Sequence, residues 1–117
     1  MAEAALFIGW ERAVPGHETE ALELFASSLA YYGKLQTEGK ITSFEPIVLS
    51  PHGGDLGGFF LLKGEPAKLD AVKRTDEFLN LLIRAGVVLS GVGVIDAFVG
   101  DSLQRTMTIY QNVLPRK

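Results

Sequence analysis

Cysteine is missing from this sequence, and its absence excludes several kinds of protein at once. None of the 117 residues is a cysteine, so the chain has no disulfide framework, no thiolate nucleophile and no cysteine-based metal site. Long apolar runs are missing as well. The longest candidate, residues 86–95, is interrupted by glycines and falls short of the ~18 residues needed to cross a bilayer. We therefore expect no membrane partner and no membrane-spanning segment.

The N-terminal residues lack the features of a secretory signal. Glu3 stands where such a signal carries basic residues, and the apolar stretch ends at residues 10–12, Trp-Glu-Arg. We expect a cytoplasmic protein that begins directly with a strand.

Positive charge is scarce and dispersed. The chain has 11 Lys and Arg against 14 Asp and Glu, for a net charge of -3, and the basic residues form no stripe, so a nucleic-acid partner is not expected. Hydrophobic residues make up 47% of the chain, and the mean hydropathy is +0.20. For a small domain, these values indicate apolar surface that is left over for an interface.

Four segments have the pattern of β-strands. Leu6, Ile8 and Trp10 alternate with their neighbours at a period of two, and residues 14–16, Val-Pro-Gly, stop this strand. The glycine-rich stretch 50–57 joins neighbouring antiparallel strands more easily than it could form a crossover. We expect strands at residues 6–10, 41–49, 58–63 and 92–99, with the middle two forming a hairpin.

The first helix is predicted from its charges and its apolar spacing. Glu18, Glu20 and Glu23 crowd the beginning, where carboxylates favour the positive end of the helix dipole. The helix ends either at Gly33 or, as we prefer, near Gly39 in the role of a left-handed cap.

A second helical pattern covers residues 66–85. We expect a break near Arg74, after which Thr75 or Asp76 could cap a second piece, and we expect Gly86 to close the helix.

The order of elements predicts the fold. One more amphipathic helix begins at residues 101–102, Asp-Ser, and ends before Pro115. With right-handed crossovers, βαββαβ gives a ferredoxin-like plait, in which both main helices cover one face of an antiparallel four-stranded sheet. We expect one α+β domain over residues 1–117, with an extra C-terminal helix.

The predicted strands are apolar on both faces. Leu6 and Ile8 oppose Phe7 on the first strand, and the third and fourth strands repeat this pattern, although a sheet with one covered face normally shows water a polar second face. Each such side chain left in water would forfeit roughly 1.5 to 3 kcal/mol. We expect a homodimer through the sheet face, and the alternative is that the C-terminal helix folds back over its own sheet.

The chain resembles the dimeric α/β-barrel superfamily, which includes antibiotic-biosynthesis monooxygenase-like and stress-responsive barrel domains. The resemblance is carried by residues 14–18 (VPGHE), 39–41 (GKI) and 75–78 (TDEF), and it extends from about Ala4 to Gly100. The resemblance implies the plait and a cavity between sheet and helices. It also implies a face-to-face dimer, in which the two sheets form a dimeric α/β barrel. Members range from cofactor-free oxygenases and haem proteins to proteins without known activity, and the C-terminal helix departs from the shortest members.

Two motifs have simpler explanations than ligand binding. The glycines of residues 53–58 resemble a phosphate loop, but no Lys-Ser/Thr and no helix follow them, so we interpret them as a hairpin loop.

His17 and His52 are the only histidines, and no second ligand stands at metal-binding spacing, so we expect no metal. We expect no cofactor either, although these two histidines could serve as axial ligands of a haem.

The candidate site residues are mostly aromatic. Trp10 and Tyr31 have the amphipathic rings that suit a pocket for a planar ligand, whereas Tyr32 shares the apolar stripe of the first helix and is predicted to be core. His52 and Arg84 are further candidates for ligand contact, and each could equally be a surface residue. His17 is the candidate general base, because the end of the first strand and the start of the first helix border the expected cavity; the alternative is a surface histidine near a helix start.

Three functions remain open. The leading one is a dimeric protein that binds a small, largely apolar organic molecule. The second is a cofactor-independent oxygenase or isomerase in which His17 moves a proton. The third is a structural or interaction dimer without a ligand.

Overall fold

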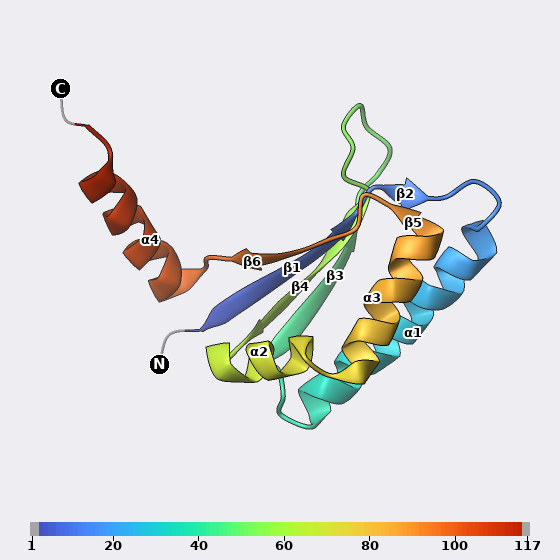
Figure 1. Ribbon diagram of the computed structural model, residues 1–117, viewed down its shortest axis with the longest axis horizontal. Helices are drawn as coiled ribbons and strands as arrows, with labels where there is room; N and C mark the ends of the chain where they lie inside the picture. The colour runs from blue at the N-terminus through green and yellow to red at the C-terminus, as the bar shows by residue number, and fades with distance from the viewer. Residues whose placement is uncertain (1–2, 116–117) are drawn as a thin grey trace.

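A computed structural model describes residues 3–115 and confirms the ferredoxin-like α+β plait (Figure 1). The elements are β1 (Ala4–Trp10), β2 (Arg12–Ala13), α1 (Glu18–Thr37), β3 (Ser43–Val48), β4 (Gly58–Gly64), α2 (Pro66–Lys73), α3 (Asp76–Val88), β5 (Leu89–Ser90), β6 (Gly93–Ala97) and α4 (Gly100–Val113). All four expected strands and all the expected helices are present.

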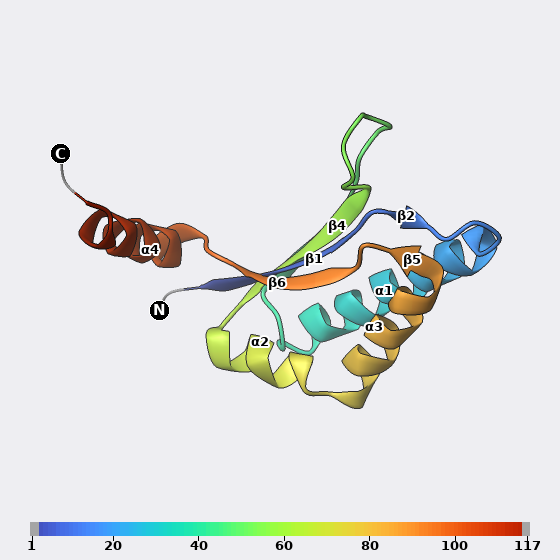
Figure 2. The ribbon, with the colours of Figure 1, turned by 45° about the horizontal axis from the view of Figure 1, so that its top comes forward.

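The main sheet has the strand order β3-β4-β1-β6, and its neighbours pair antiparallel. The hairpin of β3 and β4 is as predicted. Helices α1, α2 and α3 lie on one side of the sheet, and no helix of the described residues lies on the other side (Figure 2). The short strands β2 and β5 form a separate ladder in which Ala13 pairs with Leu89, and this ladder ties the end of α3 to the loop before α1.

The core lies between the sheet and the helices. Leu6 and Ile8 of β1 pair with Leu62 and Phe60 of β4, and all four side chains are buried toward the helices. The alternate residues of the same strands point to the opposite face, because side chains along a strand alternate between faces. The period of two therefore separates the side chains that face the helices from those on the outer face.

Helix α1 ends as the sequence predicts. Gly39 has φ +74°, a left-handed conformation that costs glycine little. The Gly39 N–H donates to the Gln36 carbonyl at 3.1 Å, and the Lys40 N–H donates to the Leu35 carbonyl at 2.9 Å. These two bonds form a Schellman motif, which satisfies the last carbonyls of the helix.

The second helical region breaks where expected but ends later than expected. Thr75 caps α3, since its hydroxyl accepts a hydrogen bond from the Phe78 N–H at 3.3 Å. The prediction that Gly86 closes the helix is wrong, because α3 continues through it to Val88. The helix stops at Leu89, which becomes extended by pairing with Ala13, and the left-handed glycine of this region is Gly91, with φ +66°.

Helix α4 extends away from the rest of the molecule (Figures 1 and 2). The last strand, β6, is shorter than the predicted 92–99, and α4 follows it after Phe98 and Val99 alone. The Cα radius of gyration is 16.0 Å, whereas a compact domain of this length would have about 13 Å. The alternative in which the C-terminal helix folds over its own sheet is not what the structure shows.

No helix within residues 3–115 has both the length and the apolar character needed to cross a membrane.

Candidate functional site

A cavity of about 450 Å³ lies between the sheet and helices α1 and α3. Its walls come from β1 and β4 on one side and from the inner faces of the two helices on the other. The ladder of β2 and β5 closes one end through Ala13 and Leu89. Leu22 and Val48 also line the cavity although both are exposed, so its mouth lies between the start of α1 and the end of β3.

Aromatic rings form much of the cavity wall. Trp10, Phe25, Tyr32 and Phe60 all line it, and they come from β1, α1 and β4. The Phe60 ring is central: its centroid lies 5.3 Å from Trp10, 5.4 Å from Phe25 and 5.1 Å from Tyr32. These distances are typical of packed aromatic pairs, so the rings hold one another in place beside an open space.

Few polar groups face this cavity. Ser28 lines it but donates its hydroxyl hydrogen to the Leu24 carbonyl at 2.8 Å. The Glu18 carboxylate at the mouth accepts a hydrogen bond from the Gly16 N–H at 2.9 Å. The Tyr32 hydroxyl makes no hydrogen bond to any residue between 3 and 115. Every completely buried side-chain nitrogen or oxygen among these residues has a hydrogen-bond partner, so the Tyr32 oxygen is not completely buried. The Tyr32 oxygen therefore borders open space.

The ionisation of Tyr32 is also perturbed. Burial, together with the neighbouring Tyr31, raises the pKa of the Tyr32 phenol above its ordinary value because the charged form would lose its hydration. The phenol is thus a neutral donor throughout the physiological range. The sequence pattern places Tyr32 correctly in the core, but it does not reveal that this core position borders a void.

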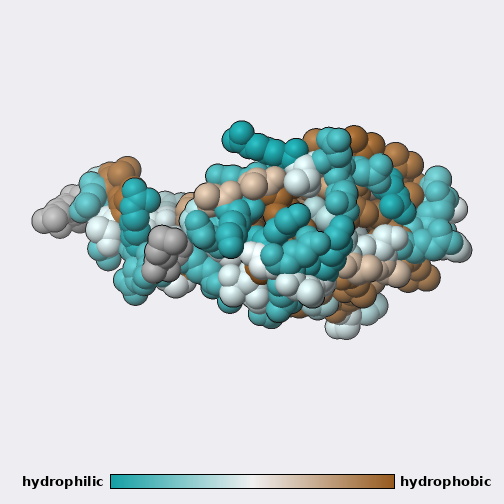
Figure 3. Space-filling view, turned by 90° about the horizontal axis from the view of Figure 1, so that it is seen from below, coloured by the Kyte–Doolittle hydropathy of each residue, from teal (hydrophilic) through white to brown (hydrophobic). Residues whose placement is uncertain are grey.

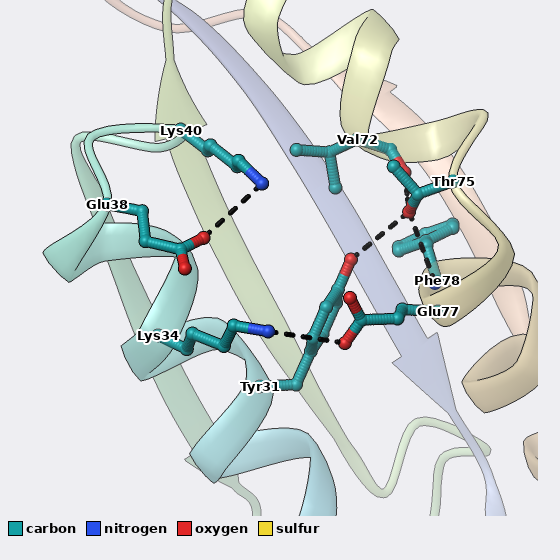
Figure 4. A network of polar contacts seen from close by, with 8 residues as sticks. All are labelled: Tyr31, Lys34, Glu38, Lys40, Val72, Thr75, Glu77 and Phe78. Atoms are coloured by element: carbon teal, nitrogen blue, oxygen red, sulfur yellow. Dashed lines mark hydrogen bonds and ion pairs between the residues drawn. The ribbon is translucent and has the colours of Figure 1, made fainter.

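Trp10 is the one predicted ligand-contact residue that lines the cavity. Tyr31, one position from Tyr32, lies elsewhere, at the junction of α1 with α2 and α3 (Figure 4). Its hydroxyl is 3.3 Å from the Thr75 hydroxyl, which also donates to the Val72 carbonyl at 2.8 Å. Tyr31 thus secures the break between the two helices.

His17 lies beside the mouth of the cavity rather than in its wall. It precedes α1 directly, and its Nδ1 is 2.9 Å from the Glu20 carboxylate. Its sequence neighbour Glu18 lines the mouth. The imidazole is half-buried and accessible to solvent, and its catalytic role stays a prediction.

His52 and Arg84 lie outside this arrangement. His52 belongs to the loop between β3 and β4, where its Nδ1 accepts from the Gly54 N–H at 2.9 Å and its Nε2 donates to the Leu56 carbonyl at 2.7 Å. Arg84 is exposed on α3, and neither residue is part of the cavity wall. Their ligand-contact roles stay predictions. Within residues 3–115, no three His, Asp or Glu side chains gather where they could hold a metal ion.

The helix-free face of the sheet is a second feature of functional interest. Cross-strand pairing places Phe7, Leu61 and Ile95 in one row of this face, beside Glu45. The Phe7 and Phe59 rings stack there with centroids 4.9 Å apart, over Gly9, which leaves room for them. The face is therefore largely apolar, and within residues 3–115 no helix covers it.

The fold and these two features define a class of protein: a ferredoxin-like plait with an apolar cavity under its helices and an apolar outer sheet face. Neither a protein-family model nor a curated protein matches the sequence. Solved structures do match the fold, and the predicted resemblance is confirmed at that level.

Three of these structures show the extent of the likeness. A dimeric ferredoxin-like protein of unknown function from Jannaschia sp. CCS1 has a TM-score of 0.67 and 17% identity, over 84% of this chain and 100% of that one. A dimeric protein of unknown function and ferredoxin-like fold from Bacteroides fragilis has a TM-score of 0.62 and 9% identity, over 81% and 94%. The protein PA3566 from Pseudomonas aeruginosa has a TM-score of 0.60 and 21% identity, over 86% and 97%.

Proposed function

We propose that this protein binds a small, largely apolar organic molecule in the cavity between the sheet and helices α1 and α3. The observation that carries the proposal is the cavity itself, about 450 Å³ in volume and walled by Trp10, Phe25, Tyr32 and Phe60. Ligand sites in proteins commonly have volumes of about 300–1,000 Å³ and mostly apolar, aromatic walls with a few polar groups.

The wall chemistry favours a planar ligand with one hydrogen-bonding group. Aromatic rings stack on planar molecules through offset or edge contacts. The Tyr32 hydroxyl, which has no partner within residues 3–115, would donate to or accept from the ligand's polar group. An anionic ligand is disfavoured, because the wall offers no compensating cation to a carboxylate or phosphate.

Trp10 provides a direct test, because it is the only tryptophan of the chain and lines the cavity. Neutral bicyclic aromatics, such as 1-naphthol and coumarin, are titrated while Trp10 fluorescence and the thermal midpoint are followed. We expect saturable quenching together with a higher Tm, since a ligand that binds only the folded state stabilises it. Linear, unsaturable quenching with no rise of Tm would instead favour a structural dimer without a ligand.

Two variants on the same helix provide the control. Ala21→Phe places a ring in the cavity wall, whereas Ala30→Phe places one on the exposed side of α1. We expect the first to reduce affinity at least about 10-fold, because the ring occupies the ligand's volume, and the second to leave it unchanged. Equal binding by both variants would contradict the cavity as the site.

We also propose that the protein is a homodimer through the helix-free sheet face. The apolar row of Phe7, Leu61 and Ile95 supports this, because solvent would otherwise cover it. The Jannaschia and Bacteroides proteins, which share the fold, are described as dimeric.

A second candidate function, proton transfer by His17, is favoured by the 2.9 Å contact between its Nδ1 and the Glu20 carboxylate. A carboxylate at this distance orients an imidazole for proton transfer. The test is turnover of a bound aromatic by wild type and His17→Ala. Unchanged turnover would discard the assignment.

A further inference from the structure

Helix α4 has an apolar face that nothing covers within residues 3–115. Its large apolar side chains share one side of the helix, since they follow spacings of three and four residues. They are Leu103, Met107, Ile109, Tyr110, Val113 and Leu114, each between 46% and 73% exposed. All fourteen residues of α4 are described, and none is buried. Figure 3 shows the helix standing apart from the body, with hydrophobic residues on its surface.

A helix in this position needs a partner to be stable. An isolated helix of fourteen residues is marginal in water, because most helical stability comes from packing an amphipathic face. The capping at its start is good: the Val99 N–H donates to the Ser102 hydroxyl at 3.0 Å. Capping does not remove the six exposed apolar side chains from water, so the apolar face indicates a binding surface.

We propose that α4 packs its apolar face on a second copy of this chain, as an arm that extends the sheet-face dimer past the β6 edge. The inference rests on the proposed dimer and adds a second contact to it. Strand β6 is an edge strand of the sheet, and its Ile95 belongs to the outer face. Only Phe98 and Val99 separate β6 from α4, so the arm leaves directly from the edge of the proposed interface.

The area of the sheet supports this arm. Four strands spaced ~4.8 Å apart and about six residues long present a flat area of only about 400 Å², whereas a stable protein interface buries about 800 Å² on each partner. A helix of fourteen residues is about 21 Å long and 10 Å wide, which adds about 200 Å². Receiving the partner's helix adds a similar area, and the total then reaches the usual size.

The polar side of α4 argues against a membrane surface as the occupant. Helices that lie on membranes carry several Lys and Arg on the polar face. Within α4 the only charged residues are Asp101 and Arg105, and they cancel. The remaining polar positions are uncharged Gln, Asn, Ser and Thr, which suits one side of a helix that faces solvent while the other side contacts protein.

The test compares two charge-matched double variants of the full chain. Met107→Glu with Tyr110→Glu places two carboxylates on the apolar face, and Thr108→Glu with Gln111→Glu places two at the same spacing on the polar face. We expect the first pair to raise the dimer dissociation constant at least about 100-fold in sedimentation equilibrium, and the second to change it less than about 3-fold. A cooperative thermal unfolding transition with a Tm close to that of the charge-matched control shows that the body stays folded.

A second measurement locates the arm. A benzophenone amino acid at position 110 should, on illumination, give a covalent dimer on a denaturing gel, whereas the same probe at position 111 should not. A wild-type dimer that is insensitive to the apolar pair, with no cross-linked dimer from position 110, would overturn the arm and leave the sheet-face dimer standing. A monomeric wild type would overturn both. Sedimentation with vesicles of phosphatidylcholine and phosphatidylglycerol in equal parts, lost only in the apolar pair, would identify a membrane as the occupant and overturn the proposal.

Discussion

Tyr31 and Tyr32 are neighbours on α1 but make different contacts. Tyr32 faces the core and is 3% exposed, as the spacing of apolar residues predicts. The same pattern leaves Tyr31 off the stripe and so favours it for a pocket, but the Tyr31 hydroxyl meets Thr75 from another helix. The void beside Tyr32 depends on how strands and helices far apart in sequence fail to fill one space, which no local spacing encodes.

The buried Tyr32 phenol predicts a loss of stability at alkaline pH. Its pKa is raised by burial and by Tyr31, so above pH ~10 the unfolded phenol ionises while the folded one stays protonated. The unfolded state then binds fewer protons, and the free energy of unfolding falls by up to about 1.4 kcal/mol per pH unit from this group. Below pH ~10 the contribution is fully present.

Urea denaturation between pH 8 and pH 11.5 or so measures this effect. We expect the stability of Tyr32→Phe to decline less steeply than that of wild type above pH ~10. Parallel curves for wild type and Tyr32→Phe would contradict the burial argument.

At the scale of elements, local chemistry predicts most boundaries. The Schellman motif at Gly39 and the cap at Thr75 both follow from residue types whose conformations have short-range causes. Gly86 is different, because glycine permits a helix to end without requiring it. The end of α3 is decided by pairing between β5 and β2, which joins segments that are distant in sequence.

Gly86 therefore lies inside a helix, where alanine should be better. A Cβ built on Gly86 meets nothing within 4 Å, and we expect Gly86→Ala to stabilise the protein by about 0.5–1 kcal/mol, because glycine loses more backbone entropy in a helix. Gly91→Ala should destabilise it by about 1–2 kcal/mol, since an L-residue is strained in left-handed backbone. The Gly91 backbone has φ +66°, and a Cβ there would also meet Glu11. Thermal and urea unfolding measure both, and a destabilised Gly86→Ala would show that this position is packed against something else.

At the scale of the whole molecule, the sheet with two apolar faces is the feature that the sequence reveals most directly. Apolar residues at successive positions of a strand show that both sides are apolar, and the right-handed crossovers then decide which side the helices cover. Helix α4 illustrates the limit. Its stripe is visible in the sequence, yet its direction away from the body depends on Gly100, whose φ is +53°, and a spacing of apolar residues says nothing about that turn.

Two isoleucines allow the outer face to be tested against the helix face. Ile95 on the outer face of β6 is 56% exposed, and Ile83 on α3 is 69% exposed. If the sheet face is the dimer interface, Ile95→Asp buries a carboxylate among apolar side chains and should raise the dimer dissociation constant about 10- to 100-fold. Ile83→Asp makes the same change on the opposite layer and should leave that constant within about 3-fold of wild type. Light scattering over a dilution series measures the dimer dissociation constants of both variants. A larger effect from Ile83→Asp would place the interface on the helices, and the outer sheet face would then need another partner.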